Sequence, residues 1–385
     1  MLRSQVAWRY AFCLSAVLAL LLIPPGRQAD AHAYSAGYTT LQFTKSGVEM
    51  TYTLDELSVI ELTGADADKN GMLEPEEFAA AEDSVKALLK QQIRLAIDRK
   101  DQEATGAVSL TLERQGNAAK AVLKANYPPV SASQTVSLTD QLYQNDTVTN
   151  YVNLVTIQYG SHKSTSALSG KYREWAMQMS ADAYAGLPSD AQSDGQPHDG
   201  ASAAGSGWYS FFVLGMNHIL TGYDHLLFLF SLLIARQKFK QYAGMITAFT
   251  IAHSMTLTLT VLGIIHVSPR IVEPMIALSI CFVAVDNVVR KQVSHRWVLT
   301  FLFGLIHGMG FADILQEMNI PRSELAADLI SFNLGIEAVQ VTLVAAILPL
   351  LMLIHRWRFS RRAIVAGSSL AFLLGGIWLV ERVAF

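Results

Sequence analysis

The sequence predicts an all-α, polytopic membrane bundle of six transmembrane helices, preceded by an exported, β-rich and sandwich-like domain. Composition is the first reason, because 51% of the 385 residues are hydrophobic and only 16% are charged, whereas soluble domains are about a quarter charged. Second, residues 34–207 carry 13 basic and 22 acidic side chains, but residues 208–385 carry 13 basic and 9 acidic. Third, apolar segments of about 20 residues recur only after Trp208. Such a chain is neither disordered nor a nucleic-acid-binding domain.

Residues 1–33 are predicted to be a secretory signal peptide. Two arginines precede the apolar run AFCLSAVLALLLI, and small residues follow it, which is the order of regions in such a peptide. Cleavage after Ala33 is favoured over cleavage after Ala31, which would leave His32 as an N-terminal metal chelator. The domain that follows is therefore expected outside the cytoplasm.

Residues 34–185 are predicted to form the exported β-rich domain. Short runs such as VEMTYTL and NYVNLVTIQY alternate polar and apolar residues, as strands with one buried face do. One helix is expected over about residues 75–97, where apolar side chains recur at helical spacing. Residues 186–207 are predicted to be a flexible linker, since Gly, Ser, Ala, Asp and Pro dominate there.

Residues 66–77, DADKNGMLEPEE, match the 12-residue loop of an EF-hand calcium site. Such a loop places oxygen ligands at positions 1, 3, 5, 7, 9 and 12, with a glycine at position 6 for the sharp turn. The predicted ligands, in that order, are Asp66, Asp68, Asn70, Met72 through its carbonyl, Glu74 and Glu77. The alternative is a solvated acidic turn, in which an aspartate only caps the next helix. The loop predicts a calcium ion as a cofactor of the exported domain.

Six apolar segments are each long enough to cross the bilayer, whose hydrocarbon core is about 30 Å thick. They are predicted at residues 208–235, 242–265, 271–289, 297–316, 328–354 and 363–383. The loops after the first, third and fifth segments are rich in Lys and Arg, and the two loops between them are not. Because positive loops stay in the cytoplasm, the N-terminal domain and the C-terminus are expected outside it.

The predicted spans contain histidines and acidic residues, which are costly in a bilayer and usually have a function there. Helical periodicity places His218 and His225 on one face of the first span, with Asp224 beside them. Imidazole and carboxylate together suit Ni²⁺, Co²⁺, Zn²⁺ or Cu²⁺. In the alternative interpretation, each histidine only hydrogen-bonds a neighbouring helix. The predicted metal site comprises His218, Asp224, His225, His253, His307, Asn333 and Glu337.

Asp286 and Asn287 lie near the cytoplasmic end of the third predicted span. They are interpreted either as an exit gate for an ion or as an interfacial cap of the helix.

The blocks HILTGYDHLLFL, TAFTIAHSMTLTL, FGLIHGMGFA and FNLGIEAVQ resemble those of the HupE/UreJ family of bacterial membrane proteins. The match is closest to the branch with a secreted N-terminal domain, and it covers residues 208–385. The resemblance implies a nickel or cobalt permease of the inner membrane. Carried over by motif, its metal-site residues are His218, Asp224, His225, His253, His307 and Glu337.

The leading hypothesis is secondary transport of a divalent metal ion, with nickel or cobalt as the substrate. The chain has no G-x-x-x-x-G-K-[ST] motif, so no ATP binding is expected. An intramembrane metal-dependent hydrolase would use the same ligands around a zinc-bound water. A calcium-responsive surface or assembly protein, anchored by the bundle, is the third hypothesis. The expected partners are the lipid bilayer and metal ions, with no nucleic acid, and the sequence leaves the oligomeric state open.

Overall fold

The computed structural model describes residues 35–115, 118–144, 150–190, 207–290, 296–317, 320–356 and 358–384. The predicted signal peptide (1–33) and most of the predicted linker (186–207) lie outside the described residues. Contacts divide the chain into two compact units. His32–Leu214 with Met318–Phe332 forms the β-rich unit, and Gly215–Glu317 with Asn333–Phe385 forms the helical unit. A β-rich region followed by a helical region was predicted, and this is confirmed.

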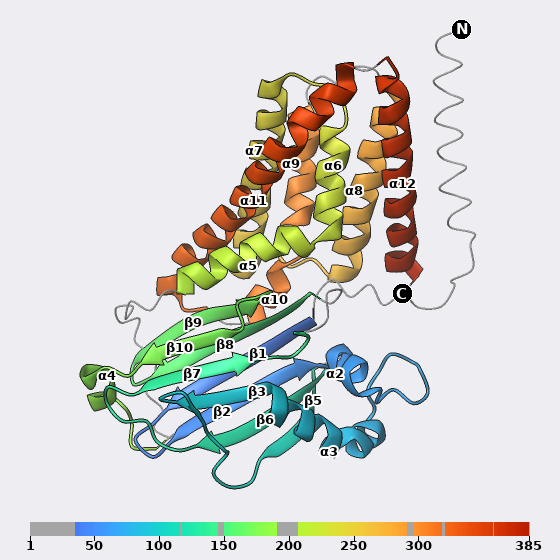
Figure 1. The fold of residues 1–385 in the computed structure, drawn as a ribbon. Coiled ribbons are helices and arrows are strands. Elements are labelled where there is room, and N and C mark those ends of the chain that lie inside the picture. Colours follow the sequence, from blue (N-terminus) through green and yellow to red (C-terminus); the bar gives the residue numbers. More distant parts are fainter. Residues whose placement is uncertain are drawn as a thin grey trace. The chain divides into compact units, whose positions relative to one another are not determined.

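The strands of the β-rich unit form two sheets (Figure 1). The six-stranded sheet has the order β5 (Ser109–Gln115), β6 (Ala118–Tyr127), β2 (Val48–Asp55), β1 (Ser35–Phe43), β8 (Tyr151–Tyr159) and β9 (His162–Ser169). The four-stranded sheet has the order β10 (Glu174–Gln178), β7 (Thr135–Asp140), β3 (Ile93–Ile97) and β4 (Lys100–Asp101). Strands β1 and β8 pair in parallel, and the other named neighbours pair antiparallel.

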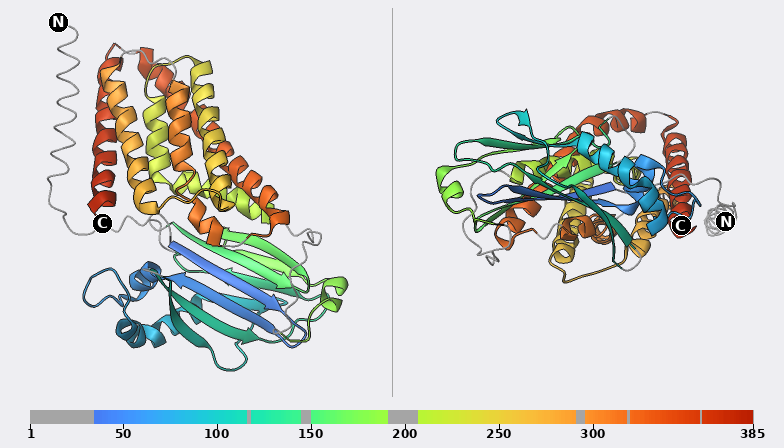
Figure 2. Two further views of the ribbon diagram at one scale, coloured as in Figure 1. Left: turned by 180° about the vertical axis from the view of Figure 1, so that it is seen from behind. Right: turned by 90° about the horizontal axis from the view of Figure 1, so that it is seen from below.

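One hydrophobic core joins the two sheets. The strands of both sheets can be followed from behind and from below in Figure 2. Leu41 and Tyr52 of the larger sheet and Leu95 and Leu138 of the smaller sheet are fully buried in it. The alternating burial along β2 shows why the polar–apolar pattern of its sequence forms a strand, since every second side chain enters the core.

The described part of this unit contains three complete helices: α2 (Glu56–Thr63), α3 (Pro75–Gln92) and α4 (Ala181–Ala185). Helix α3 was predicted to continue to residue 97, and this end is wrong because it stops at Gln92. The following segment, Ile93–Ile97, pairs with β7 and buries most of its side chains, so tertiary pairing decides its conformation. Helix α2 begins at the Asp55 N-cap, whose carboxylate accepts a hydrogen bond from the Ser58 amide.

The helical unit continues from α5 (Gly207–Thr221), whose second half it contains. The remaining helices are α6 (Tyr223–Leu233), α7 (Phe239–Val261), α8 (Pro269–Val289), α9 (Arg296–His307), α10 (Ala312–Glu317), α11 (Arg322–Arg356) and α12 (Ser360–Ala384). Helix α7 packs against α9, and α8 packs against both α12 and α6. Among the described residues, four helices are long and apolar enough to cross a membrane: α7, α8, α11 and α12.

Two of the predicted spans are interrupted, so the predicted number of six spans stays a prediction. The first predicted span, 208–235, breaks at Gly222 into α5 and α6, which run in different directions (Figure 1). The fourth, 297–316, breaks after His307 into α9 and α10. Helix α6 has 11 residues, or about 16 Å of rise, which is half the thickness of the hydrocarbon core.

Glycines allow α9 to approach α7 closely. A Cβ atom on Gly304 would lie 2.7 Å from the Phe249 carbonyl oxygen, and one on Gly308 would collide with the backbone of His253. Any larger residue at these positions would therefore separate the helices. The absence of side chains there brings His307, which lies between the two glycines, close to α7.

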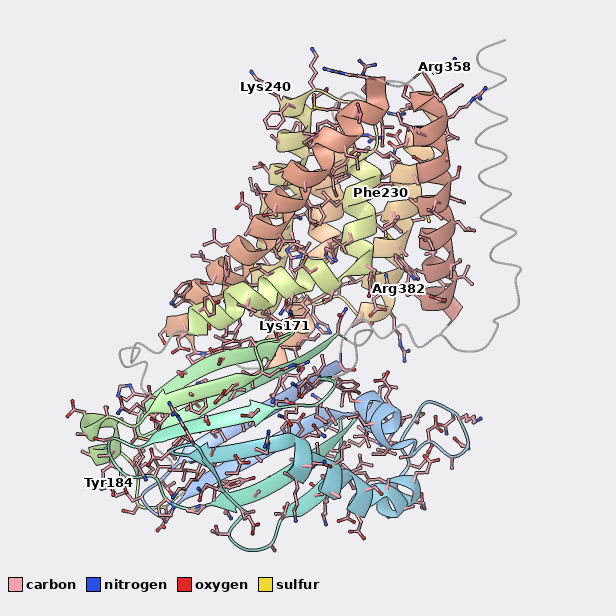
Figure 3. All side chains as sticks on the ribbon, in the orientation of Figure 1. Lys171, Tyr184, Phe230, Lys240, Arg358 and Arg382 are labelled. Atoms are coloured by element: carbon pink, nitrogen blue, oxygen red, sulfur yellow. The ribbon has the colours of Figure 1, made fainter. Side chains whose placement is uncertain are left out.

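Basic residues gather at one end of the helical unit. Figure 3 labels Lys240 and Arg358 at this end, and Arg382 toward the opposite end. Arg358, just before the start of α12, lies at the same end as Lys240. The C-terminus of α8 meets the start of α12 there, because Arg361 donates to the carbonyls of Asn287 and Val288. Lys240 of the first predicted basic loop and Arg358 of the last thus lie at the same end of the unit.

The first turns of α11 belong to the β-rich unit. The amide and hydroxyl of Thr165 on β9 each lie 3.0 Å from Glu324 Oε2, and the hydroxyl lies 2.9 Å from Asp328 Oδ2. These hydrogen bonds hold the start of α11 against the sheet edge. The fifth apolar segment was predicted at residues 328–354, and the candidate membrane span in α11, Ser323–Arg356, contains it.

A carboxylate is buried between the sheets of the β-rich unit. Asp140 Oδ2 accepts hydrogen bonds from the Tyr151 hydroxyl and the Asn153 amide, both at 2.7 Å, and Oδ1 accepts from the Leu142 amide at 2.9 Å. The Tyr151 hydroxyl also lies 2.6 Å from that of Tyr52. Burial raises the pKa of the Asp140 carboxyl, although these hydrogen bonds oppose the shift.

We compare the unfolding free energy of wild type with that of the variant Asp140→Asn. The advantage of wild type is expected to fall as the pH rises above 3.8, the ordinary pKa of this carboxyl. Because the folded-state pKa is raised, the folded protein holds the proton more tightly than the unfolded chain, so the stabilisation is complete only at low pH. Hydrogen exchange of the β7 and β8 amides in both full-length proteins, at a series of pH values, measures this difference. A pH-independent difference would contradict a titrating Asp140.

Candidate functional site

Three histidines from the interior of the helical unit come together. The ring nitrogens that His218, His225 and His253 can offer to a metal all lie within 4.8 Å of one another. All three side chains are buried, and His253 has no exposed surface. The ring centroids of His218 and His225 are 4.7 Å apart, although Gly222 breaks the helix between them. These residues, together with His307, are called the histidine cluster below.

His307 completes the cluster from α9. Its ring centroid lies 5.1 Å from that of His225. His307 Nδ1 lies 2.8 Å from the Phe303 carbonyl oxygen, so this nitrogen carries the proton and the ring offers Nε2 as a lone pair. Nε2 of His307 and Nε2 of His225 are buried and have no hydrogen-bond partner within the described part of the chain.

Asp224 lies beside the cluster and holds His225. Its Oδ1 is 2.8 Å from His225 Nδ1, and its Oδ2 is 3.4 Å from Arg382 Nη2. Arg382 also contacts Glu273 Oε2 at 3.8 Å. Asp224 therefore fixes the ring so that His225 Nε2 is left to face the cluster, as carboxylates do beside metal-bound histidines. We call Asp224, Arg382 and Glu273 the carboxylate clamp.

Asn333 and Glu337 of α11 occupy different environments. Asn333 accepts a hydrogen bond of 2.7 Å from Ser254, the residue after His253. Gln340 is buried and accepts from Thr250 at 3.0 Å, so α11 turns these two amides toward α7. Glu337 is exposed on the surface of the unit. Its carboxylate is not among the converging ligand atoms, which belong to His218, His225 and His253.

Aromatic and aliphatic side chains surround the histidine cluster. Phe311 packs on His218 and Phe228 on His307, each with ring centroids 4.7 Å apart. A cavity of about 10 Å³ adjoins His225 and is lined by apolar side chains and Gln340. That volume holds no more than about one water molecule, so the described conformation encloses the cluster.

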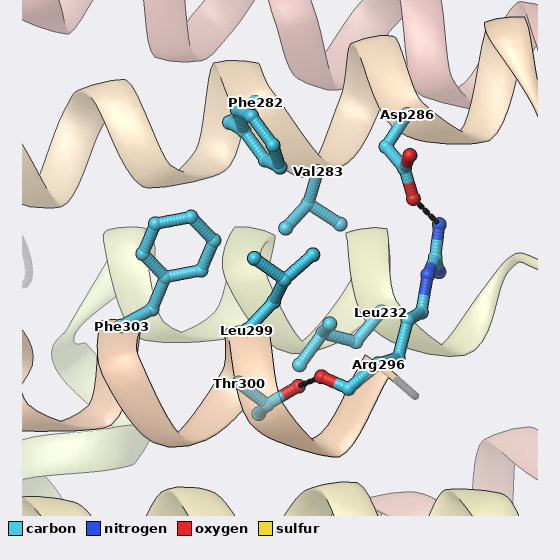
Figure 4. A pocket seen from close by; sticks show the side chains of 8 residues that line it. All are labelled: Leu232, Phe282, Val283, Asp286, Arg296, Leu299, Thr300 and Phe303. Atoms are coloured by element: carbon cyan, nitrogen blue, oxygen red, sulfur yellow. Dashed lines mark hydrogen bonds and ion pairs between the residues drawn. The ribbon is translucent and has the colours of Figure 1, made fainter. Parts of the chain in front are cut away.

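A second charged group lies near the end of the unit that carries Lys240. Asp286 Oδ2 is 2.9 Å from Arg296 Nη2, and both side chains are almost completely buried (Figure 4). Arg296 also donates to Asn287, whose amide donates to the Ser231 carbonyl at 2.7 Å. Asp286, Asn287 and Arg296, called the arginine lock below, tie α6, α8 and α9 together.

Arg296 and Arg382 are the functional candidates that the sequence analysis missed. Arg296 was counted only as a loop charge, although a carboxylate such as Asp286 inside a span requires a partner. Arg382 lies at the end of the bundle where few basic residues were expected. An arginine at the charge-poor end of the last predicted span is a signal that indicates a buried acidic partner.

The predicted calcium loop joins two helices, α2 and α3. Carboxylate oxygens of Asp66, Asp68 and Glu77 lie within 4.8 Å of one another, and Gly71 makes the turn with a φ of +77°. Asn70 Nδ2 lies 2.8 Å from Glu74 Oε1. Helix α2 precedes the loop and α3 follows it.

The Asp66 and Glu77 carboxylates also organise the backbone of this loop. Asp66 accepts from the Asn70 and Gly71 amides, and Glu77 accepts from the Ala67 amide at 2.7 Å. Hydrogen bonds with the Glu74 side chain and the Ala67 amide hold the pKa of Glu77 below its ordinary value. Glu77 is thus kept in the ionised form that a cation requires.

The family model described as HupE / UreJ protein matches residues 197–382. This range contains the histidine cluster, the carboxylate clamp and the arginine lock. No curated protein matches the chain significantly.

Replacing Asp286 by alanine is expected to cost about 3–5 kcal/mol of folding free energy, because Arg296 would stay buried without its counter-ion. The loss is measured as a lower unfolding temperature of the purified protein in detergent. Arg290→Gln is the matched control, since Arg290 also contacts Asp286 but is 55% exposed, and exposed pairs contribute less than about 1 kcal/mol. Equal stability of Asp286→Ala and wild type would show that the lock does not hold the helices.

Proposed function

Residues 197–382 belong to the HupE/UreJ family, a family associated with nickel and cobalt transport, and we propose that this multi-pass membrane protein transports a divalent transition-metal ion, with nickel or cobalt as the best candidates. The observation that carries the proposal is the convergence of His218, His225 and His253 in the interior of the helical unit.

The donor set of the cluster suits such an ion. Neutral imidazoles bind nickel, cobalt, zinc and copper, whereas magnesium and calcium prefer oxygen ligands. Two nitrogens bound to one ion at about 2.1 Å each are at most about 4.2 Å apart. The rings of His218, His225 and His253 therefore need only small rotations to share an ion, because their ligand atoms already lie within 4.8 Å.

The interrupted helices support transport. Substrate sites of secondary transporters commonly lie where membrane helices are broken. Here α5 and α6 break at Gly222, between His218 and His225, and α9 ends at His307. The two interruptions adjoin the same histidine cluster.

Two charged groups suit gates on either side of this cluster. The carboxylate clamp holds Asp224 at the end that carries Arg382, and the arginine lock closes the end that carries Lys240. In our proposal the basic end faces the cytoplasm, the C-terminus and the exported β-rich domain lie outside the inner membrane, and the ion passes from the clamp toward the lock.

Transport is favoured over metal-dependent hydrolysis by the state of the carboxylates. A hydrolase needs a general base within reach of a metal-bound water. Both oxygens of Asp224 are engaged, by His225 and Arg382, and Glu337 is exposed. Asp224 is better suited to position His225 than to accept a proton from water.

Alanine at His218, His225 or His253 is expected to abolish high-affinity nickel or cobalt accumulation by cells that lack their own uptake system. Each change removes one of three ligands from a site with little room for water. Radiometal uptake and equilibrium dialysis of the purified protein measure transport and binding separately.

His266→Ala is the matched control, because His266 is exposed and lies outside the cluster. Asp224→Asn should lower metal affinity by about 10–100-fold, as losses of such supporting partners do. Unchanged uptake by the His218 and His225 variants would refute the proposed site. Stoichiometric metal binding without uptake by the wild type would favour the hydrolase.

We also propose that the loop at residues 66–77 binds calcium. Its support is the helix–loop–helix arrangement, with three carboxylates converging around the Gly71 turn. An isolated loop of this kind outside the cytoplasm fits weak, structural binding, with dissociation constants of about 10⁻⁴–10⁻³ M.

Glu77→Gln is expected to remove the calcium-dependent stabilisation of the β-rich unit, because Glu77 occupies the position of the bidentate ligand. Thermal unfolding of the full-length protein with calcium or with a chelator measures the effect. Glu76→Gln is the control of equal charge, since Glu76 lies next to the ligand but outside the ligand positions. Equal calcium responses of the two variants would contradict a site that uses Glu77.

A further inference from the structure

The middle of the predicted calcium loop is held by a buried glutamate that is not one of the predicted ligands. Glu56, the first residue of α2, is only 8% exposed, and glutamate is almost never buried without partners. Its Oε1 accepts a hydrogen bond of 2.6 Å from the Leu73 amide, and its Oε2 accepts one of 3.3 Å from the Ala119 amide on β6. Glu56 therefore ties the loop to the larger sheet.

Arg114 on β5 holds the carbonyl of the same loop residue. Its Nη2 donates to the Leu73 carbonyl oxygen at 2.9 Å and lies 3.7 Å from Glu56 Oε1. The Leu73 side chain is completely buried in the hydrophobic core of the unit. The amide, the carbonyl and the side chain of Leu73 are thus all fixed by groups outside the loop. The sequence has no second loop of this pattern, so the β-rich unit itself has to keep this one in shape.

The peptide group that Glu56 holds contains a predicted calcium ligand. The Leu73 amide belongs to the same peptide as the carbonyl of Met72, the predicted ligand at loop position 7. This peptide is trans and planar, so its N–H and C=O bonds point in opposite directions. Because the N–H points at Glu56, the Met72 carbonyl oxygen points away from it. Hydrogen-bonded groups also polarise one another, so the carboxylate makes this oxygen a better ligand.

The next peptide is arranged in the same way. Arg114 binds its carbonyl oxygen, and its N–H, which belongs to Glu74, lies 3.3 Å from Glu77 Oε2. Glu77 is the predicted bidentate ligand at position 12. Glu56 and Arg114 therefore hold the two peptides that flank Leu73, one of which carries a predicted ligand and the other a donor to one.

We propose that Glu56 is a positioning residue of the calcium site, which orients the Met72 carbonyl toward the ion with support from Arg114. This inference rests on the proposed calcium binding by residues 66–77, and it assigns a role in that binding to side chains outside the loop. Partners that orient metal ligands are typically worth about 10–100-fold in metal affinity. A glutamate that only satisfied two buried amides would affect stability and leave calcium affinity unchanged.

Amide hydrogen exchange of residues 64–80, measured by mass spectrometry on the full-length protein in lipid nanodiscs, tests the proposal. Calcium is raised at constant ionic strength, and the midpoint is the concentration that gives half of the calcium-dependent protection. Glu56→Gln leaves one acceptor oxygen for two amides, and we expect it to raise this midpoint at least about tenfold. At saturating calcium it should regain the protection of wild type, whereas Glu77→Gln should not.

Two controls separate calcium affinity from stability. Glu61→Gln removes an equal charge from the same helix, where Glu61 accepts from the Tyr143 hydroxyl instead, and should leave the midpoint unchanged. Val59→Ala removes part of a buried side chain of α2, and should lower the calcium-free protection without a comparable rise in the midpoint.

Arg114→Gln keeps the proposal testable if Glu56→Gln does not fold, because the Arg114 side chain is 34% exposed. It should raise the midpoint in the same direction by a smaller factor. A midpoint of Glu56→Gln equal to that of Val59→Ala, or an unchanged midpoint of Arg114→Gln, would overturn the role of these side chains while calcium binding by wild type stood. Absence of calcium-dependent protection in wild type would refute the calcium site itself, and this inference with it.

Discussion

The helical unit depends on one carboxylate, that of Asp224, which lies between a histidine and an arginine. Its Oδ1 fixes the ring of His225, and its Oδ2 holds Arg382 on the last helix. Without this negative charge, Arg382 and any cation among the histidines would repel each other in a medium of low dielectric constant. Asp224 follows Gly222, where the chain leaves α5 and begins α6. Residues 222–225 thus contain the helix break, the carboxylate that orients His225 and the partner of Arg382 on α12.

Close helix packing is the second condition for the histidine cluster. His307 reaches His225 because Gly304 and Gly308 bring α9 against the backbone of α7. Phenylalanines then fill the remaining space around the rings. An enclosed, apolar environment favours neutral imidazole, which is the form that binds a metal. The same environment makes entry of an ion difficult, so a transporter with this site has to open the bundle on one side at a time.

Local sequence patterns predicted the features that depend on neighbouring residues. The spacing from Asp66 to Glu77 is read along one loop. Helical periodicity predicted His218 and His225 on one face of a single span; their rings are close, but they lie on two helices, α5 and α6. Features that depend on distant packing could not be predicted in this way. Glu337 shares a helix with Asn333, but only the position of α7 decides that Asn333 and Gln340 are turned inward and Glu337 is exposed. The strand at Ile93–Ile97 depends likewise on its pairing with β7. The break at Gly222 falls within the sequence TGYDH, a polar interruption of the apolar run that the first predicted span had included.

The two buried arginines are better explained by movement than by stability. A buried ion pair of the Asp286–Arg296 kind is often no more stabilising than apolar side chains of similar size, since both charges lose their hydration. A bundle selected only for stability would have no need for such a pair near each end of one histidine cluster.

Ion pairs do, however, have two well-defined states: the partners are either paired, or separated and hydrated. An ion that neutralises or competes with the charge of one partner changes the equilibrium between the paired and the separated state. The size of this change equals the difference between the ion's binding free energies for the two states. A cation that reaches the histidines weakens the attraction of Asp224 for Arg382, because it offers the carboxylate a second positive partner. In the transport cycle that we propose, the clamp would be the element through which occupancy of the cluster opens one end of the bundle while the arginine lock keeps the other end closed.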